Sequence, residues 1–142
     1  MEQLFNTLSE KLINNLKSGE HLQVNIKGEQ SQFIRFSQSK VRQSGLVDDA
    51  SVSITLIHDE RSCNGSFTLR GDDDLDEKTA LTELGRLRKE VATLPKDPFV
   101  VIPENTGSSR EDHHGNLLSE EKMIDALSPA MKGVDLAGIW AS

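Results

Sequence analysis

Acidic residues form the densest chemical cluster in this sequence. They occupy five of the six positions of DDDLDE at 72–77. A calcium-binding loop places its acids at alternate positions, with a glycine at the sharp turn and a distal glutamate. These acids are consecutive instead and lead into a helical pattern of leucines. We therefore interpret them as the N-terminus of a helix, where the helix dipole favours negative charge.

Histidines are the next residues that could do chemistry. An Asp-His-His triplet stands in REDHHG at 110–115. Adjacent histidines seldom converge on one metal ion, and the phosphoesterase family with this signature needs further aspartate clusters that the preceding strands lack. We expect a mobile polar loop here rather than a metal site. His21 and His58 lie at strand positions, and the sequence indicates no partner for either.

Cys63 is the only cysteine, so an internal disulfide is excluded. A nucleophilic cysteine needs a nearby base or a helix N-terminus that lowers its pKa, and the sequence predicts neither. We expect a buried structural thiol. The sequence also lacks a glycine-rich phosphate loop, a Gly-x-Ser-x-Gly elbow and a His-Glu-x-x-His helix. Its own residues therefore define no active site.

Composition narrows the class of protein. The 142 residues carry a formal net charge of −7, which disfavours direct contact with nucleic acid or anionic membranes, because such binding neutralises phosphates. The basic run RLRK at 86–89 falls on a helical pattern, where solvated side chains are the default. The N-terminus does not resemble a signal peptide, and no apolar run approaches the ~18 residues of a membrane span. We expect a soluble, cytoplasmic protein.

Hydrophobic periodicity predicts an α+β fold, with an antiparallel or mixed sheet of four to six short strands and two or three packed helices. Leucines four apart near the N-terminus indicate an amphipathic helix, and alternating apolar residues indicate strands joined too closely for parallel crossovers. Ser119 is expected to cap the third helix and Pro129 to shorten it. The expected helices cover 3–17, 72–94 and 119–133, and the expected strands cover 21–27, 31–36, 40–46, 50–58, 62–70 and 134–142.

The chain is expected to form a single N-terminal domain of a longer protein. Residues 1–102 would hold the first helix, a strand meander and the long helix. Residues 103–118 would be a flexible loop, and residues 119–142 would add a short helix and a truncated strand. The last segment ends at its apolar residues with no polar tail, which indicates that the strand is cut there.

The stretch FIRFSQSKVRQSG at 33–45 has the least regular pattern. Apolar and charged residues alternate at its start, and a run of Ser, Gln, Lys and Arg follows with no turn residue before Gly45. This pattern favours a solvated sheet edge with one apolar face.

Three segments together carry a resemblance to a known family. They are FIRFSQSKVRQSG, the strand region SVSITLIHDERSCNGSFTL and the helix DEKTALTELGRLRKEVATLP. In their order they resemble the N-terminal domain of the TldD/PmbA family, proteins often labelled modulators of DNA gyrase and understood as metallopeptidases. The matching residues are Arg35, Phe36 and Gln43, the pair Asn64-Gly65 in the hairpin, and Gly138 and Ser142 in the closing strand.

The resemblance implies that the catalytic machinery lies outside this chain. The family's zinc ligands lie in a His-Glu-x-x-x-His helix plus a later Cys or His, all in a C-terminal domain, and nothing in these 142 residues matches them. This chain alone is then inactive and without a cofactor. Zinc would belong to the missing domain, where it lowers the pKa of a bound water. Some family members lack the motif and act as the partner subunit of one that has it.

The resemblance also implies partners. The substrate would be a peptide or unfolded protein, and the full-length protein would form a homodimer or a heterodimer with a family paralogue; any effect on gyrase would be indirect. We hypothesise that strand 31–44 lines a channel for peptide, with Arg35 and Gln43 as substrate-binding residues, because a polar edge strand accepts extended peptide. The alternative is that both are solvated edge residues. A function from another class also stays open, that of a free-standing α+β protein-interaction module without enzymatic activity.

Overall fold

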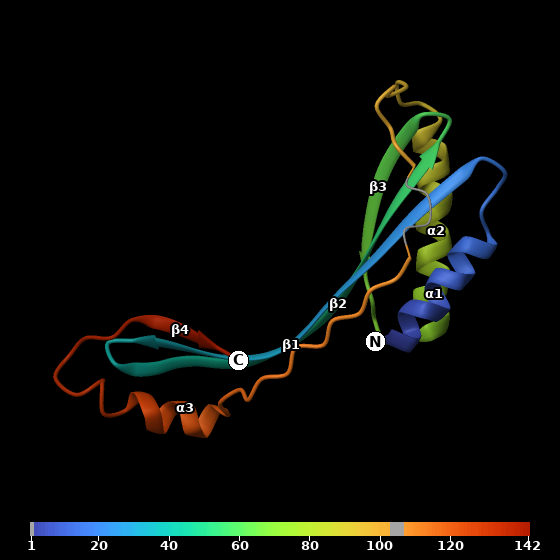
Figure 1. Cartoon of the computed structure of the whole chain (residues 1–142). Helices are drawn as coiled ribbons and strands as arrows, with labels where there is room; N and C mark the ends of the chain where they lie inside the picture. The colour runs from blue at the N-terminus through green and yellow to red at the C-terminus, as the bar shows by residue number, and fades with distance from the viewer. Residues whose placement is uncertain (1, 103–106) are drawn as a thin grey trace. The chain divides into compact units, whose positions relative to one another are not determined.

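The computed structural model describes residues 2–102 and 107–142, which form three helices and a four-stranded antiparallel sheet (Figure 1). The strand order is β3-β2-β1-β4, and the predicted α+β class is confirmed. In chain order the elements are α1 (Glu2–Asn14), β1 (Glu20–Ser37), β2 (Lys40–His58), β3 (Arg61–Thr68), α2 (Asp73–Val91), α3 (Glu120–Leu127) and β4 (Gly138–Ala141).

The described residues fall into two compact units, and the two longest strands contribute to both. The first unit comprises Met1–Gly28 and Asp49–Thr106, and the second comprises Glu29–Asp48 and Gly107–Ser142. The sequence did not predict that residues 29–48 would group with the C-terminal helix and strand. Part of the predicted loop, residues 103–106, lies outside the described residues.

Four of the predicted short strands are in fact two long ones. The segments 21–27 and 31–36 belong to β1, which passes through Gly28 without ending, and 40–46 and 50–58 belong to β2. A single glycine in extended conformation does not interrupt a ladder when the neighbouring strand continues beside it. The apolar alternation fades in the middle because these residues are far from either buried cluster, and the polar positions there are exposed.

Both hairpins turn through two residues with positive φ. Gln38 and Ser39 join β1 to β2, at φ 52° and 51°, and Asp59 and Glu60 join β2 to β3, at 51° and 59°. Positive φ at both central residues is the type I′ pattern that suits the twist of a hairpin. The first turn lies between the predicted strands 31–36 and 40–46, although Gln and Ser are weak turn signals.

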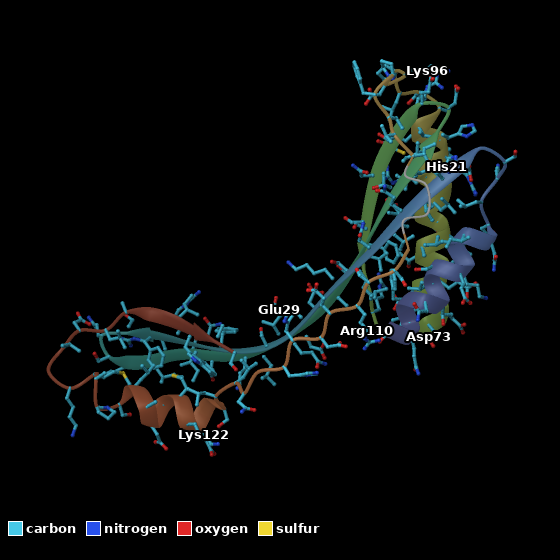
Figure 2. The ribbon with its side chains drawn as sticks, in the orientation of Figure 1. His21, Glu29, Asp73, Lys96, Arg110 and Lys122 are labelled. Carbon is cyan, nitrogen blue, oxygen red and sulfur yellow. The ribbon has the colours of Figure 1, made fainter. Side chains whose placement is uncertain are left out.

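Charged side chains hold the second of these turns. Lys96 Nζ donates to Asp59 Oδ1 at 2.7 Å, and Arg61 pairs with the same carboxylate; Figure 2 labels Lys96. These two cations hold the pKa of Asp59 below its ordinary value, and the hydrogen bond from Lys96 is the larger cause. The backbone N–H of Asp97 also donates to the carbonyl of Glu60 at 2.7 Å.

The core of the first unit is aliphatic, as its helical and strand periodicities predict. The leucines of α1 and α2 pack on the apolar face of β2, and this burial is the main favourable term for folding. The fully buried members of this cluster are Leu8, Leu12, Val52, Ile54, Leu56, Cys63, Ala80, Leu84, Leu87 and Val91.

The acidic cluster forms the start of α2, as predicted. The Asp72 side chain caps the helix by accepting a hydrogen bond from the Leu75 backbone N–H at 3.0 Å. Asp76 is fully buried, and its carboxylate accepts from the backbone N–H groups of Arg70 at 2.9 Å and Gly71 at 3.1 Å. The sequence pattern predicted the helix start but not that one of these acids would be buried.

An ion pair ties the start of β1 to α2. Arg88 Nε donates to Glu20 Oε1 at 2.7 Å and its Nη2 to Oε2 at 2.8 Å, and the Glu20 side chain is only 6% exposed. Arg88 Nη2 also donates to the carbonyl of Asn15. The hydrogen bonds from Arg88 are the largest cause that lowers the pKa of Glu20.

The lowered pKa predicts a pH-dependent contribution to stability. An acid with a depressed folded-state pKa stabilises the protein above its unfolded pKa, and this contribution is lost as the pH falls through the folded-state value. We expect Glu20→Gln to cost about 1–2 kcal/mol at pH 7. The difference from wild type should shrink below the ordinary glutamate pKa of 4.5. Urea unfolding at pH 7, 5 and 3 measures it, and Glu10→Gln, at an exposed position of α1, is the matched surface control.

Cys63 is buried, as predicted. Its Sγ donates to the Leu87 carbonyl at 3.4 Å, and burial raises the pKa of its thiol. Because the thiolate is the reactive form, we expect Ellman's reagent at pH 8 to label the native protein slowly and the urea-unfolded protein within seconds. Labelling of the native protein at the unfolded rate would contradict this placement.

The second unit has a much smaller core. Among its described residues three side chains are buried, Ile34 and Phe36 of β1 and Met123 of α3, and Trp140 of β4 packs against them. The Ser119 side chain caps α3 by accepting from the Lys122 backbone N–H at 3.5 Å, as predicted. The helix ends at Leu127, two residues before Pro129, because a proline shortens the helix that precedes it.

Candidate functional site

The strand 31–44 was expected to be a sheet edge, and this is wrong for its first half. β4 pairs with β1 in the register Phe33↔Ala141 to Phe36↔Gly138, so β1 lies inside the sheet there. A sequence pattern indicates which face of a strand is buried. Whether the strand lies at the edge of the sheet depends instead on a partner strand, here about 100 residues away in the sequence. The N-terminal half of β2 does lie at an edge, because β3 pairs only with its residues Ser51 to His58.

β4 pairs with β1 as far as Gln32, on the side of β1 that lies away from β2. Gln32 and Ser142 exchange two backbone hydrogen bonds, of 2.9 and 3.0 Å. Between Glu20 and Ser31 none of the described strands pairs with this side of β1. Alternate residues of a strand direct their N–H and C=O groups to the same side, so Gln30 is the next residue that presents both groups to this side of β1.

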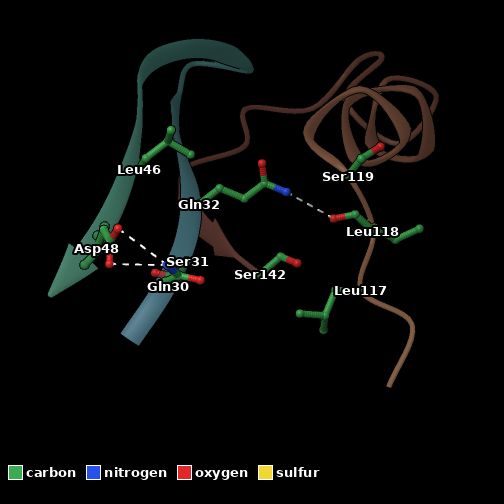
Figure 3. Close-up of a pocket in the computed structure, with 10 residues that line it drawn as sticks. Gln30, Ser31, Gln32, Leu46, Asp48, Leu117, Leu118, Ser119 and Ser142 are labelled. Carbon is green, nitrogen blue, oxygen red and sulfur yellow. Dashed lines mark hydrogen bonds between the residues drawn. The ribbon is translucent and has the colours of Figure 1, made fainter. Parts of the chain in front are cut away.

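A shallow groove of about 560 Å³ lies beside this part of β1, within the second unit (Figure 3). Its most prominent side chains are three leucines, Leu46 of β2 and Leu117 and Leu118 of the segment before α3. They are 82%, 76% and 48% exposed. Large aliphatic side chains that gather in a hollow at this exposure mark a binding surface. The residues that line the groove are Gln30, Ser31, Gln32, Leu46, Val47, Asp48, Leu117, Leu118, Ser119 and Ser142.

Two glutamines of β1 form the polar part of the groove. Gln30 Nε2 lies 3.5 Å from both carboxylate oxygens of Asp48, and Gln32 Nε2 donates to the Leu118 carbonyl at 3.5 Å (Figure 3). Asp48 is the one ionisable side chain among the described lining residues. Its contacts to Gln30 are at the upper limit of hydrogen-bond length, so Gln30 forms only weak hydrogen bonds with this carboxylate.

The structure does not bring the two predicted site residues into one cluster. Arg35 is exposed and opposite Ile139 of β4, on the face of β1 that lies away from Ile34 and Phe36. Gln43 is exposed on the edge half of β2. Within the described residues no hydrogen bond or ion pair joins them, and their role in binding stays a prediction.

The groove leucines were missed, although the sequence held a signal for two of them. Leu117 and Leu118 are adjacent apolar residues at the end of a polar loop, directly before the capping residue of a helix. Such a pair is usually buried, and its exposure becomes visible only in the structure. Leu46 gave no such signal, because it ended a predicted strand.

The other candidate residues form no catalytic cluster in the described part of the chain. Residues 110–115 are exposed, and Arg110 pairs there with Asp112 through a 2.8 Å contact. Over residues 2–102 and 107–142, no three His, Cys, Asp or Glu side chains are arranged to hold a metal ion. The resemblance places zinc in a domain outside these residues, and we derive no metal-dependent step from them.

Two smaller expectations are also settled by the structure. His58 has a partner after all, because its Nδ1 lies 3.1 Å from the Gly19 carbonyl. The basic run at 86–89 includes two arginines that are already paired, Arg86 with acids of its own helix and Arg88 with Glu20.

None of the described helices is long and apolar enough to cross a membrane.

Three helices and a four-stranded antiparallel sheet define an α+β fold, and its second unit carries the shallow apolar groove. A similar fold occurs in the crystal structure of a "putative modulator of a DNA gyrase" from Thermotoga maritima, with a TM-score of 0.54 and 14% sequence identity. The similarity covers 91% of this chain and 28% of that chain, so this chain spans less than a third of its neighbour's length. At this identity the likeness establishes the fold alone. No family model and no curated protein matches the chain.

Proposed function

We propose that this chain is a non-catalytic domain that binds an extended polypeptide by strand addition to β1. The observation that carries the proposal is the groove of the second unit, where Leu46, Leu117 and Leu118 lie exposed beside the β1 strand. An extended segment there would pair its backbone with β1 as β4 does further along. Backbone pairing gives affinity with little dependence on sequence, and neighbouring pockets add selectivity.

The fold supports a place for this domain in a larger protein. We propose that it serves as the substrate-channel or assembly domain of a TldD/PmbA-type metallopeptidase. The likeness to the gyrase-modulator structure over most of this chain, and over a minor part of that one, supports this arrangement. The zinc and its ligands would then belong to another domain. Binding at β1 would hold the substrate peptide extended, the conformation that peptidases cleave.

The alternative is a free-standing interaction module with no enzymatic partner domain. It is favoured by the position of the groove, because all of its described lining residues belong to the second unit. The gene sequence 3′ of codon 142 discriminates the two. A continuing reading frame that encodes His-Glu-x-x-x-His supports the peptidase arrangement, and a stop codon supports the module.

Strand addition is tested with backbone-modified peptides. We expect a fluorescein-labelled nine-residue extended peptide to bind with micromolar affinity. N-methylation of the residues whose N–H groups face β1 should abolish binding, because it removes the donors of the ladder. N-methylation of the alternate residues is the matched control and should leave binding within about twofold. Equal loss from both sets, or no binding of any peptide, would contradict the proposal.

A further inference from the structure

We propose that Asn64 is a site of spontaneous deamidation, which the pairing of β3 with β2 keeps closed and which reacts when β3 opens. Asn64-Gly65 is the one Asn-Gly pair in the sequence. Asparagine is among the thermally labile residues, and a following glycine leaves the attacking backbone nitrogen unhindered and free to rotate. The residues concerned all belong to the first unit, and none of them lines the groove.

The reaction joins the side chain of Asn64 to the backbone of the next residue. The Gly65 nitrogen attacks Asn64 Cγ, a C–N bond forms, and the side-chain amide nitrogen leaves as ammonia with the proton of the Gly65 nitrogen. Water then opens the resulting succinimide ring at either of its carbonyl carbons. One opening gives aspartate. The other gives isoaspartate, whose main chain is longer by a methylene group and would shift the residues after it out of register with β2.

The strand pairing keeps the reacting atoms apart in the folded protein. Gly65 is opposite Ile54 of β2. The Leu69 N–H donates to the Ala50 carbonyl at 2.8 Å. Alternate residues of a strand direct their N–H groups to the same side, so the Gly65 N–H also faces β2. Attack requires Gly65 to leave the ladder and the Asn64 side chain to fold back over it, which a strand backbone with ψ of about +135° does not allow.

Hydrogen bonds of Asn64 itself add to this restraint. Thr55 is opposite Asn64, and its Oγ1 donates to Asn64 Oδ1 at 2.8 Å. The Asn64 carbonyl accepts from Arg86 Nη2 at 3.4 Å, so α2 also holds the backbone beside the reacting nitrogen. β3 lies at the end of the strand order and pairs with β2 alone among the described strands. Its opening therefore breaks a single ladder and exposes Asn64 to reaction.

The packing of α2 explains why this labile pair stands in β3. A β-carbon on residue 65 would overlap the Glu83 carboxylate. That carboxylate accepts a hydrogen bond from Arg86 Nη2 at 2.8 Å. Glycine at 65 lets this ion pair lie against the strand, and it also leaves an unhindered nitrogen next to Asn64.

Peptide mapping by mass spectrometry measures the reaction. Native protein and protein unfolded in guanidinium chloride are held at pH 8, and conversion to the acid is followed at Asn64 and Asn25. Asn25 is the internal control, because it is exposed on β1 and precedes isoleucine, whose branched side chain hinders attack. We expect Asn64 to convert at least tenfold faster than Asn25 in denaturant. In the native protein Asn64 should convert at least tenfold more slowly than in denaturant, because only the open form reacts.

Thr55→Val separates the protection by the fold from the intrinsic chemistry. It removes the hydrogen bond to Asn64 and keeps a β-branched residue in the strand. We expect native conversion of Asn64 to rise about threefold, because the lost hydrogen bond favours opening, and conversion in denaturant to stay the same. Thr68→Val, the same substitution at an exposed position of β3, is the matched control and should change neither rate.

Each part of the proposal has an outcome that overturns it. Conversion of native Asn64 at the denatured rate would show that β3 does not close the site. Conversion in denaturant no faster than that of Asn25 would show that Asn64 is not a deamidation site. An unchanged native rate in Thr55→Val, or an equal rise in Thr68→Val, would overturn the protective role of the Thr55 hydroxyl.

Discussion

Phe36→Ala is expected to unfold the second unit while the first unit stays folded. Phe36 is 4% exposed and is the largest of only three buried side chains in its cluster. Truncation of a buried phenylalanine costs about 3–5 kcal/mol through lost burial and the cavity left behind. A core of this size contributes too little stability to remain folded after such a loss. The cluster of the first unit contains ten other buried residues and does not include Phe36.

The chain contains a natural reporter for each unit. Its one tryptophan, Trp140, packs on the small core, and its one cysteine, Cys63, is buried in the large one. In Phe36→Ala we expect the Trp140 emission to shift to that of solvent-exposed indole without denaturant. Cys63 should keep its slow labelling by Ellman's reagent.

Phe99→Ala is the matched control, because Phe99 is 86% exposed and its removal should change neither reporter. If Phe36→Ala exposed both reporters together, the two units would fold as one cooperative body. If it left the Trp140 emission native, the cluster around Met123 would not be the core that holds β4 and α3.

Asp76→Ala is expected to destabilise the first unit by about 3 kcal/mol. The Asp76 carboxylate is fully buried and accepts hydrogen bonds from two backbone N–H groups, those of Arg70 and Gly71. Hydrogen bonds to a charged group contribute about 1.5–3 kcal/mol each, and a buried donor left without a partner costs its desolvation. Alanine removes both acceptors and opens a small cavity at the start of α2.

Asp76→Asn separates the charge from the hydrogen bonds. Its amide oxygen keeps one acceptor, so we expect a loss of about half that of alanine. Asp74→Ala, on the exposed side of the same helix turn, should cost less than about 0.5 kcal/mol. Urea unfolding followed by Cys63 labelling measures all three. Equal stability of Asp76→Ala and wild type would contradict the role of this carboxylate as the link between β3 and α2.

The sequence predicted those parts of the fold that repeat locally. Leucines at helical spacing gave the helices, and alternation through Val52, Ile54 and Leu56 gave the best-buried strand. Ser119 was recognisable as a helix cap, and the acids at 72–77 as the start of a helix, although not which of them caps it. Long-range pairing was not predictable, because no local pattern states that residues 138–141 pair with 33–36. The passage of β1 through Gly28 depends in the same way on its neighbour strand.

The residues that line the groove were not predicted from the sequence. The stretch 31–44 adjoins the groove, which begins at Gln30 and Ser31. Arg35 and Gln43 were chosen for their chemical type, whereas the groove depends on Leu117 and Leu118, about 85 residues further along the chain. Leucines indicate a core when only the sequence is known, and their exposure follows from tertiary packing.

Amide hydrogen exchange at Gln30 tests the central claim, strand addition to β1, most directly. The Gln30 backbone N–H points to the side of β1 on which β4 pairs, and that of Gln32 is already paired with the Ser142 carbonyl at 2.9 Å. With a saturating extended peptide we predict that exchange at Gln30 slows by at least tenfold, while exchange at Gln32 changes little. A peptide that binds and leaves exchange at Gln30 unchanged would show that it binds elsewhere and would contradict strand addition at β1.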